Sequence, residues 1–327
     1  MEPLPAFSPP VWLRNALVQT VLASSGLRAR GENPMAAAAN KVIVDAGRGV
    51  RLLGFHSPQP KGKSSRGLVV LLHGWQGSAD SSYVLAAGRR LYAGGFDVFR
   101  LNLRDHGESH HLNEGLFYAT LLDEVFYAVR QVSRLARNAP AFLAGFSLGG
   151  NFALRIARRC TQEPIKGLRH VAAISPVLNP EKVTDRIDGH PLLRRYFLRK
   201  WRKSLARKQR LFPERYDFRD ILQLPTLRRM TERLLDRYSP YGSCRAYFLE
   251  YTLLGDALRS VEIPTTVITA QDDPIIPVED FQRLESGPAV RLFIHRYGGH
   301  NGFVETLRSS WCDRALASLF RRTGEVG

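Results

Sequence analysis

Cysteine is scarce in this chain of 327 residues, and its pattern excludes two classes of protein. The three cysteines, Cys160, Cys244 and Cys312, lie far apart in the sequence. An odd and sparse set provides neither a disulfide framework nor the ligand spacing of a zinc site. We therefore expect a protein of a reducing compartment, the cytoplasm.

The sequence also has no long apolar segment. The apolar stretch 16–23 is short, and Gln19 and Thr20 interrupt it. A membrane-spanning helix needs about 20 mostly apolar residues. Residues 1–5 lack the basic region with which a signal peptide begins. Neither a signal peptide nor a membrane span is expected from these features.

Acidic residues are outnumbered, with 30 Asp and Glu against 47 Lys and Arg, which gives a formal net charge of +17. Lysine contributes little to the excess, because only 8 of these cations are Lys and 39 are Arg. A surface this basic attracts anions. No recognition motif and no series of stacking aromatic residues accompanies the charge, so nucleic acid is not an expected partner.

Strand-like and helix-like segments alternate along most of the chain. Strands are predicted at 41–45, 50–56, 67–72, 97–102, 141–146, 169–175, 263–270 and 290–295. Helices are predicted at about 81–94, 116–137 and 150–160. The first two strands should pair antiparallel around a glycine turn. The later alternation indicates an α/β domain whose mostly parallel sheet is flanked by helices.

The most informative motif is Gly145-Phe146-Ser147-Leu148-Gly149, which lies between an apolar run and a helix-forming run. A strand, a sharp turn and a helix with a serine at the apex are typical of the nucleophile elbow of serine hydrolases. The flanking glycines leave room for the crowded turn. The string alone is a weak signal, and its context makes it strong. Ser147 is therefore the predicted nucleophile, and a tightly packed glycine turn is the alternative.

A serine hydroxyl is a poor nucleophile unless a base accepts its proton. His300, in the glycine-rich loop after strand 290–295, is the candidate base. Asp272 and Asp273 both follow strand 263–270, and either could orient the histidine. Loops that follow parallel strands meet at one edge of the sheet. These residues are therefore expected to converge on Ser147.

The loop after strand 67–72 has the sequence His73-Gly74-Trp75-Gln76-Gly77-Ser78. In this arrangement the loop supplies one amide of the oxyanion hole, and the residue after the nucleophile supplies the other. We assign these backbone donors to Trp75 and Leu148. The His73 ring is expected to brace the loop.

A cluster of Asp105, His106, His110 and His111 has the composition of a metal site. A metal site also requires ligands placed by geometry and a supporting shell of hydrogen bonds. Bracing of the loop after strand 97–102, or a place at the edge of the pocket, is the simpler explanation. No metal is expected.

Residues 178–260 break the alternation of strands and helices. Leu193, Phe197, Trp201 and Leu205 recur every four residues, which places them on one face of a helix. Basic side chains surround this stripe, and no acidic residue lies between residues 191 and 209. The basic face is either a solvated surface or a surface that attracts anionic lipid or an acidic substrate.

The motifs together resemble those of the bacterial YheT-like group of α/β-hydrolases, which is related to a set of eukaryotic membrane-associated abhydrolases. The resemblance covers nearly the whole chain, and each motif alone is less specific than the combination. It is carried by residues 13–15, 18–20, 73–78, 102–107, 145–151, 270–274 and 298–300. One departure is Trp75, where relatives often carry leucine. Since the expected role of this residue is a backbone one, the departure affects the shape of the acyl pocket and not the type of reaction.

The resemblance implies an α/β-hydrolase fold with a core of residues 1–177 and 261–327 and a helical cap of residues 178–260. It also implies a carboxylic-ester hydrolase with Ser147 as nucleophile, Asp273 as acid and His300 as base, which needs no cofactor. The expected substrate is a small-molecule or lipid ester, and weak attraction to an anionic membrane surface is a further expectation. Acyl transfer to an acceptor other than water uses the same residues and is the alternative, as is a membrane-associated lipid esterase.

Overall fold

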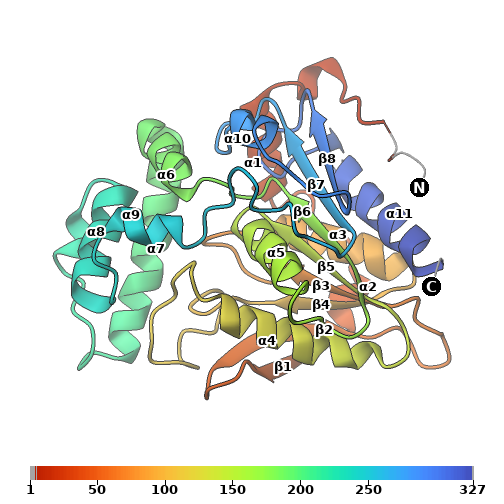
Figure 1. The fold of residues 1–327 in the computed structure, drawn as a ribbon, viewed down its shortest axis with the longest axis horizontal. Coiled ribbons are helices and arrows are strands. Elements are labelled where there is room, and N and C mark those ends of the chain that lie inside the picture. Colours follow the sequence, from red (N-terminus) through yellow and green to blue (C-terminus); the bar gives the residue numbers. More distant parts are fainter. Residues whose placement is uncertain (1–3, 5, 326–327) are drawn as a thin grey trace.

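The computed structural model, which describes residue 4 and residues 6–325, contains an eight-stranded sheet in the order β1-β2-β4-β3-β5-β6-β7-β8 (Figure 1). The strands are β1 (Asn40–Asp45), β2 (Arg51–Ser57), β3 (Leu68–Leu72), β4 (Asp97–Leu101), β5 (Ala141–Phe146), β6 (Leu168–Ile174), β7 (Thr265–Ala270) and β8 (Val290–His295). Strand β2 pairs antiparallel with β1 and β4, and all other neighbours are parallel. The mostly parallel sheet predicted from the sequence is confirmed.

Helices cover both faces of the sheet because its central strands are apolar on both sides. In β3, Leu68, Val70 and Leu72 join one buried cluster, while Val69 and Leu71 join the other. This is the alternation expected of a strand. Helices α4 (Leu122–Ser133) and α5 (Leu148–Arg159) contribute to the first cluster, and α3 (Ser82–Ala93) and α11 (Trp311–Glu325) contribute to the second.

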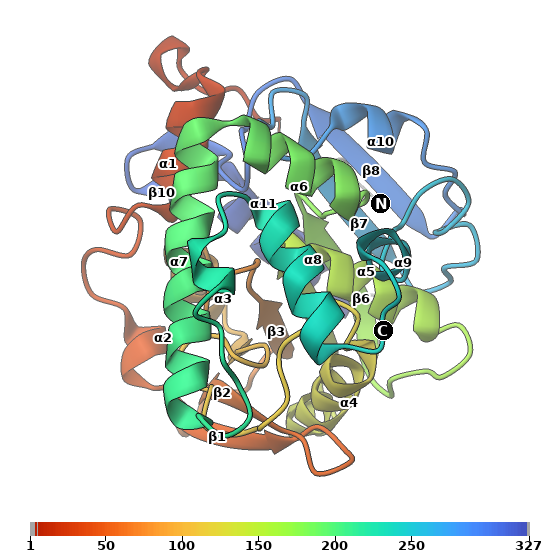
Figure 2. The ribbon, with the colours of Figure 1, turned by 90° about the vertical axis from the view of Figure 1, so that its left-hand side faces the viewer.

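Four helices lie between β6 and β7 in the sequence: α6 (Pro180–Gly189), α7 (Pro191–Leu211), α8 (Leu227–Tyr238) and α9 (Cys244–Leu249). Figure 1 shows them beyond one end of the sheet, and Figure 2 shows α7 and α8 in front of that end. The predicted apolar stripe of α7 packs inward, since Leu205 is buried and Leu193, Phe197 and Trp201 are half-buried against the same cluster.

The remaining short elements lie around this core. They are η1 (Val11–Leu13), α1 (Ala16–Ser24), α2 (Pro34–Ala37), η2 (Arg134–Ala136), η3 (Ile221–Gln223), α10 (Val278–Gln282), β9 (Val304–Thr306) and β10 (Ser309–Ser310). No helix in the described part of the chain is long and apolar enough to cross a membrane. Apart from Leu4, the five N-terminal residues used in the signal-peptide argument lie outside the described residues.

The predicted helix at 116–137 is shorter in the structure, because α4 begins at Leu122. The backbone just before it is bonded to distant side chains instead. The amide of Phe117 donates to Asp105, the amide of Ala119 donates to the Tyr247 hydroxyl, and the carbonyl of Ala119 accepts from Arg155. These tertiary hydrogen bonds replace the bonds that a helical turn would make.

Candidate active site

Ser147 lies at the turn between β5 and α5 with a backbone conformation of φ 54° and ψ −116°. This positive φ is strained for a residue with a side chain. The turn is possible because its glycines allow close approach: a Cβ on Gly145 would lie 2.1 Å from the carbonyl oxygen of Gly149. A Cβ on Gly149 would lie 2.5 Å from the carbonyl oxygen of Leu72, in β3. The strained turn holds the serine at the carboxyl end of the strand.

The three residues proposed from the sequence as nucleophile, base and acid lie in one line of hydrogen bonds. His300 Nε2 is 3.0 Å from Ser147 Oγ, and His300 Nδ1 is 2.9 Å from Asp273 Oδ2. The other carboxylate oxygen of Asp273 accepts from the amides of Ile275 and Ile276 at 2.8 and 2.9 Å. A proton on Nδ1 then points at the carboxylate, which leaves Nε2 free to accept the proton of the serine hydroxyl.

Asp272, the competing acid, points to a different group. Its Oδ1 accepts a hydrogen bond from the amide of Gly299 at 2.9 Å, and no hydrogen bond joins it to the His300 ring. Burial raises the pKa of Asp272, while its bonds to the backbone amides of Gly299 and Gly298 oppose that shift. Asp272 thus holds the glycine-rich loop, and Asp273 holds the imidazole.

The two backbone amides assigned to an oxyanion hole lie beside Ser147. Trp75 and Leu148 line the same cavity as Ser147 and His300. Among the described residues, neither amide donates a hydrogen bond to a protein acceptor. Both N–H groups are therefore available to an oxygen atom of a bound substrate.

Two buried histidines hold the loop that carries Trp75. His73 Nδ1 donates to the Gly74 carbonyl at 2.8 Å, and its Nε2 accepts from the Leu103 amide at 3.1 Å. His106 Nε2 accepts from the amide of Gln76 at 3.2 Å. Burial lowers the pKa of both rings, that of His106 to about 4, so both are neutral acceptors at pH 7. The bracing expected for His73 is thus made by two rings.

Two residues of α1 support the histidine loop and were not identified as part of the site from the sequence. Thr20 Oγ1 accepts from the amide of His300 at 2.9 Å. Gln19 donates to the carbonyl of Val304 at 3.0 Å and accepts from its amide at 2.7 Å. The signal was present as two polar residues within an apolar stretch, where a buried polar side chain needs specific partners.

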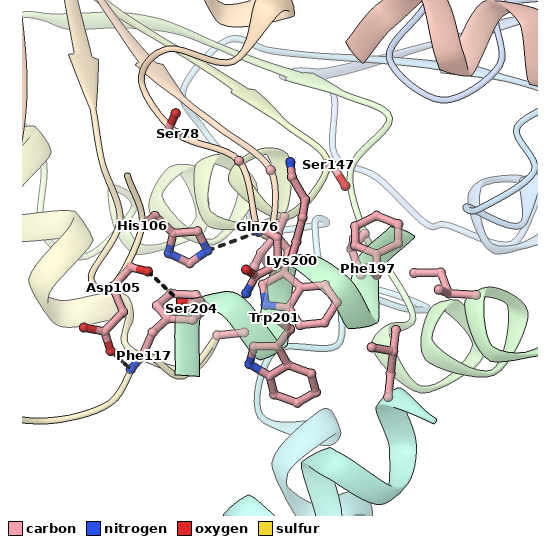
Figure 3. A pocket seen from close by; sticks show the side chains of 18 of the residues that line it. Gln76, Ser78, Asp105, His106, Phe117, Ser147, Phe197, Lys200, Trp201 and Ser204 are labelled. Atoms are coloured by element: carbon pink, nitrogen blue, oxygen red, sulfur yellow. Dashed lines mark hydrogen bonds between the residues drawn. The ribbon is translucent and has the colours of Figure 1, made fainter. Parts of the chain in front are cut away.

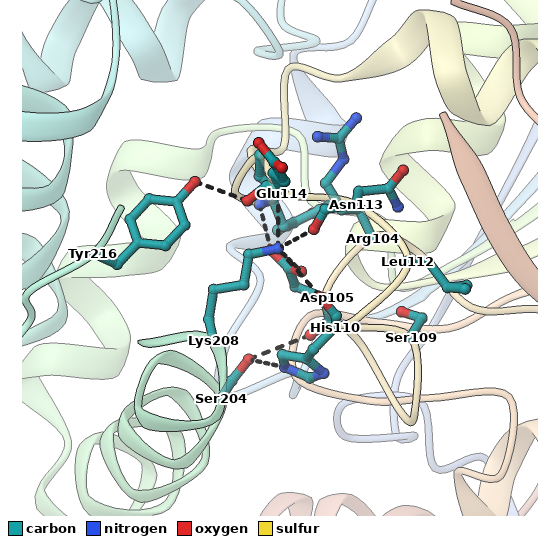
Figure 4. A network of polar contacts seen from close by, with 12 residues as sticks. Arg104, Asp105, Ser109, His110, Leu112, Asn113, Glu114, Ser204, Lys208 and Tyr216 are labelled. Atoms are coloured by element: carbon teal, nitrogen blue, oxygen red, sulfur yellow. Dashed lines mark hydrogen bonds and ion pairs between the residues drawn. The ribbon is translucent and has the colours of Figure 1, made fainter. Parts of the chain in front are cut away.

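The cluster of Asp105, His106, His110 and His111 is spread over different contacts. Asp105 binds the ammonium group of Lys208 in α7 at 2.8 Å, and His110 Nε2 lies 2.8 Å from the Ser204 hydroxyl of the same helix (Figure 4). His111 is exposed. Within the described residues, no group of three His, Cys, Asp or Glu side chains is placed to hold a metal ion. Asp105 and His110 instead attach α7 to the loop after β4.

A cavity of about 610 Å³ opens over Ser147, between the strand ends and the helices α6–α9. Figure 3 shows Phe197, Lys200 and Trp201 of α7 on its wall. The Trp75 ring stacks on Phe197, with centroids 5.6 Å apart, and lies edge-on to Trp201 at 5.1 Å. The aromatic side chain of Trp75 therefore shapes this wall, as the departure from leucine suggested.

The basic residues of α7 do not form one uniform surface. Lys200 and Lys203 line the cavity, whereas Arg199 is exposed outside it. Arg202 donates to the carbonyl of Leu224 at 2.8 Å. These cations thus lie in three places: on the cavity wall, within the helical segment formed by α6–α9, and on the outer surface.

The sequence was compared with models of known protein families and with known proteins. A sequence model of the alpha/beta hydrolase family matches residues 69–308. Phospholipase ABHD3 of Bos taurus is 24% identical over 272 residues, which are 81% of this chain and 66% of that protein. The Escherichia coli protein named "Putative esterase YheT" is 26% identical over 263 residues, which are 76% of this chain and 74% of that protein. The chain thus spans just under two thirds of the length of ABHD3. These matches agree with the resemblance indicated by the sequence motifs.

Solved structures share the fold at low sequence identity. An arylesterase structure aligns with a TM-score of 0.58 and 18% identity, over 94% of this chain and 90% of that one. An esterase of Pyrococcus furiosus aligns with a TM-score of 0.52 and 20% identity, over 88% of this chain and 90% of that one. At this identity both likenesses show the fold alone, and they establish the fold class.

Proposed function

Because the chain belongs to the alpha/beta hydrolase family, we propose that it hydrolyses carboxylic esters through an acyl-enzyme formed on Ser147. One observation carries the proposal. Ser147 Oγ, His300 Nε2, His300 Nδ1 and Asp273 Oδ2 are connected at 3.0 and 2.9 Å at the base of a cavity large enough for a small-molecule or lipid ester. The esterase and phospholipase names of the relatives support the same reaction class.

In the first half of the reaction, Ser147 Oγ attacks the acyl carbonyl carbon while His300 Nε2 takes the hydroxyl proton. The carbonyl oxygen becomes an oxyanion, which accepts hydrogen bonds from the amides of Trp75 and Leu148. Asp273 stabilises the imidazolium and keeps the ring oriented. The tetrahedral intermediate then expels the alcohol, which takes its proton from His300.

In the second half, water replaces the alcohol. His300 takes one proton from the water as its oxygen attacks the acyl carbon, and the same two amides receive the second oxyanion. Collapse of this intermediate releases the carboxylic acid, and His300 returns the proton to Ser147. Every step uses side chains and amides of this chain, so no cofactor enters the scheme.

We assign residues 178–260 as a cap and residues 1–177 and 261–327 as the core. Support comes from the cavity, whose walls combine Ser147 and His300 with Phe197 of α7, Leu234 of α8 and Phe248 of α9. A cover of this kind excludes water from the reacting groups and shapes the acyl site.

The three cysteines are free thiols, which fits our assignment of the protein to the reducing cytoplasm.

Two measurements test the proposal. A fluorophosphonate probe should label Ser147, located by peptide mapping, and Ser147→Ala should abolish the labelling. A series of p-nitrophenyl esters of increasing acyl length should be hydrolysed with the free acid as the product. Labelling of another residue would refute the assignment of the nucleophile, and transfer of the acyl group to an added alcohol in place of water would indicate an acyltransferase.

A further inference from the structure

The cavity over Ser147 contains cations that no carboxylate balances. Its charged lining residues are Asp80, Asp105, Lys200, Lys203, Arg207 and Lys208. Both carboxylates are already paired. Asp80 binds Arg100 at 2.6 Å, and Asp105 binds Lys208 at 2.8 Å. Within the described residues, no ion pair involves any of the other three cations, so the cavity has an excess of positive charge.

Lys200 is the member of this group best placed to act on a substrate. It is half-buried on α7, and its Nζ lies 4.9 Å from the centre of the Tyr196 ring. Figure 3 shows the side chain extending from α7, among the residues that line the cavity with Ser147. The pKa of His73 is lowered first by burial, then by the neighbouring His106 ring, and further by the positive charge of Lys200. Lys200 therefore lies near the loop that carries His73 and Trp75.

A partly desolvated ammonium group without a counter-ion is unfavourable. The Tyr196 ring offers only a weak substitute, because a cation–π contact at an exposed ring contributes much less than a desolvated ion pair. An anion that enters the cavity would supply the missing charge. Arg207 adds to the same potential and is held in place by a hydrogen bond to the carbonyl of Gly107 at 3.0 Å.

We propose that the protein acts on esters that carry an anionic group, a carboxylate or a phosphate, and that Lys200 is the residue that binds this group. The inference rests on the proposed esterase function. Lys200 is a specificity residue in this scheme, and it takes no part in the proton transfers of Ser147 and His300.

The rest of the cavity suggests where the charge lies in the substrate. Aliphatic side chains of the cap, Val183, Ile187, Leu227 and Leu234, line the cavity together with Ser147. Burial of the methylene groups of a substrate against such a surface is favourable, because it removes apolar surface from water. We therefore place the apolar acyl chain against this wall and the anionic group on the alcohol side of the ester.

Four phenyl butanoates that differ only at the 3-position of the ring test the proposal. They are 3-butanoyloxybenzoate, 3-butanoyloxyphenyl phosphate, the neutral 3-butanoyloxybenzamide and the cationic 3-butanoyloxyphenyl trimethylammonium. The wild type should show a kcat/KM for at least one anionic ester about tenfold above that for the amide, the effect of one charge-assisted hydrogen bond. The larger of the two anionic ratios identifies carboxylate or phosphate as the group recognised.

The anionic-to-neutral ratio should fall about tenfold in Lys200→Met, and Lys200→Arg should retain most of it because the positive charge remains. Arg199→Gln is the matched control. It removes one positive charge from the adjacent, exposed position outside the cavity, so the ratio should be unchanged. The wild-type ratio should also decrease as salt is added. Thermal melting of each variant checks the fold.

The results separate this inference from the proposed function. If the neutral ester is hydrolysed but the wild type shows no preference for an anion, the inference is wrong and the esterase assignment stands. Equal losses of the ratio in Lys200→Met and Arg199→Gln would also overturn it, since net charge would then explain the preference. Failure of the wild type to hydrolyse any of the four esters would overturn both.

Discussion

The ammonium group of Lys208 lies 2.8 Å from Oδ1 of Asp105, and both side chains are buried. Lys208 belongs to α7 and Asp105 to the loop after β4, so the pair joins the helical segment to the sheet. Lys208 also donates to the carbonyl of Asn113 at 2.6 Å (Figure 4). A further bond to the carbonyl of Gly115 measures 3.1 Å. Burial raises the pKa of Asp105 and lowers the pKa of Lys208, and their mutual attraction opposes both shifts.

Replacing Lys208 with methionine should destabilise the protein strongly. The change leaves the Asp105 carboxylate buried without its cation, and removal of one partner of a buried pair costs about 3–5 kcal/mol. Urea unfolding gives the free energy directly. Lys203→Met, at an exposed lysine of the same helix, is the control and should change stability by less than about 0.5 kcal/mol. Equal stability of the two variants would mean that the pair contributes little.

Ser147→Ala should abolish ester hydrolysis and leave the fold intact. Loss of the nucleophile of such a triad lowers turnover by about 10⁴- to 10⁶-fold. Alanine accepts the strained backbone of the turn about as well as serine, since both carry a Cβ, so the melting temperature should change little. Turnover of p-nitrophenyl butyrate and thermal melting check both parts. Activity above about a tenth of wild type would refute the assignment.

Asp273→Asn should reduce activity far more than Asp272→Asn. An amide at position 273 presents an N–H group or a weaker acceptor to His300 Nδ1, and the wrong imidazole tautomer can cost about 10⁴-fold in turnover. Asparagine at position 272 keeps an oxygen that can accept from the amide of Gly299. The two kcat values on one ester decide the matter, and a larger loss in Asp272→Asn would identify Asp272 as the acid.

The buried neutral histidines should make stability fall on acidification. Burial lowers the pKa of His106 and of His170 to about 4, below the unfolded value of 6.5. As the pH drops from 6.5 toward 4, the unfolded chain takes up these protons first, so stability present above pH 6.5 is lost within this window. At pH 5 the loss should be about 2 kcal/mol per histidine.

Urea unfolding at pH 7.5, 6 and 5 measures this loss. His106→Gln should show a smaller change between pH 7.5 and 5 than the wild type, because one of the buried histidines with a lowered pKa is removed. His111→Gln, at an exposed histidine, should behave as the wild type. A wild-type stability that is constant from pH 7.5 to 5 would contradict the prediction.

The outer basic face of α7 should bind anionic membranes weakly. Arg195 and Arg210 are exposed and lie outside the cavity. Each charge near an anionic surface contributes about 1 kcal/mol, which added salt screens. Co-sedimentation with phosphatidylserine vesicles at low and high salt should show binding that salt weakens and that the double variant Arg195→Gln/Arg210→Gln reduces. Absence of wild-type binding at low salt would leave this face as a solvated surface.

Local chemistry in the sequence was sufficient to predict the sheet and the turn on which Ser147 lies. The β5–α5 turn needs glycine at positions 145 and 149, because a Cβ there would meet backbone atoms, and this requirement is visible in the motif itself. The alternation of strands and helices likewise predicted the parallel sheet, since its central strands are apolar on both faces. The place of Ser147 at a strand end therefore follows from residues within a few positions of it.

Only the tertiary structure decided which distant groups meet. Asp272 and Asp273 are adjacent in sequence, and the path of the loop alone determines which carboxylate reaches His300. Thr20 contacts the amide of His300 across 280 positions of sequence. Lys200 and Lys208 are two lysines of the same helix, and the sequence does not distinguish them. In the structure Lys200 lines the cavity and has no carboxylate partner among the described residues, whereas Lys208 is buried against Asp105. Such differences arise from packing between elements, and no local pattern encodes them.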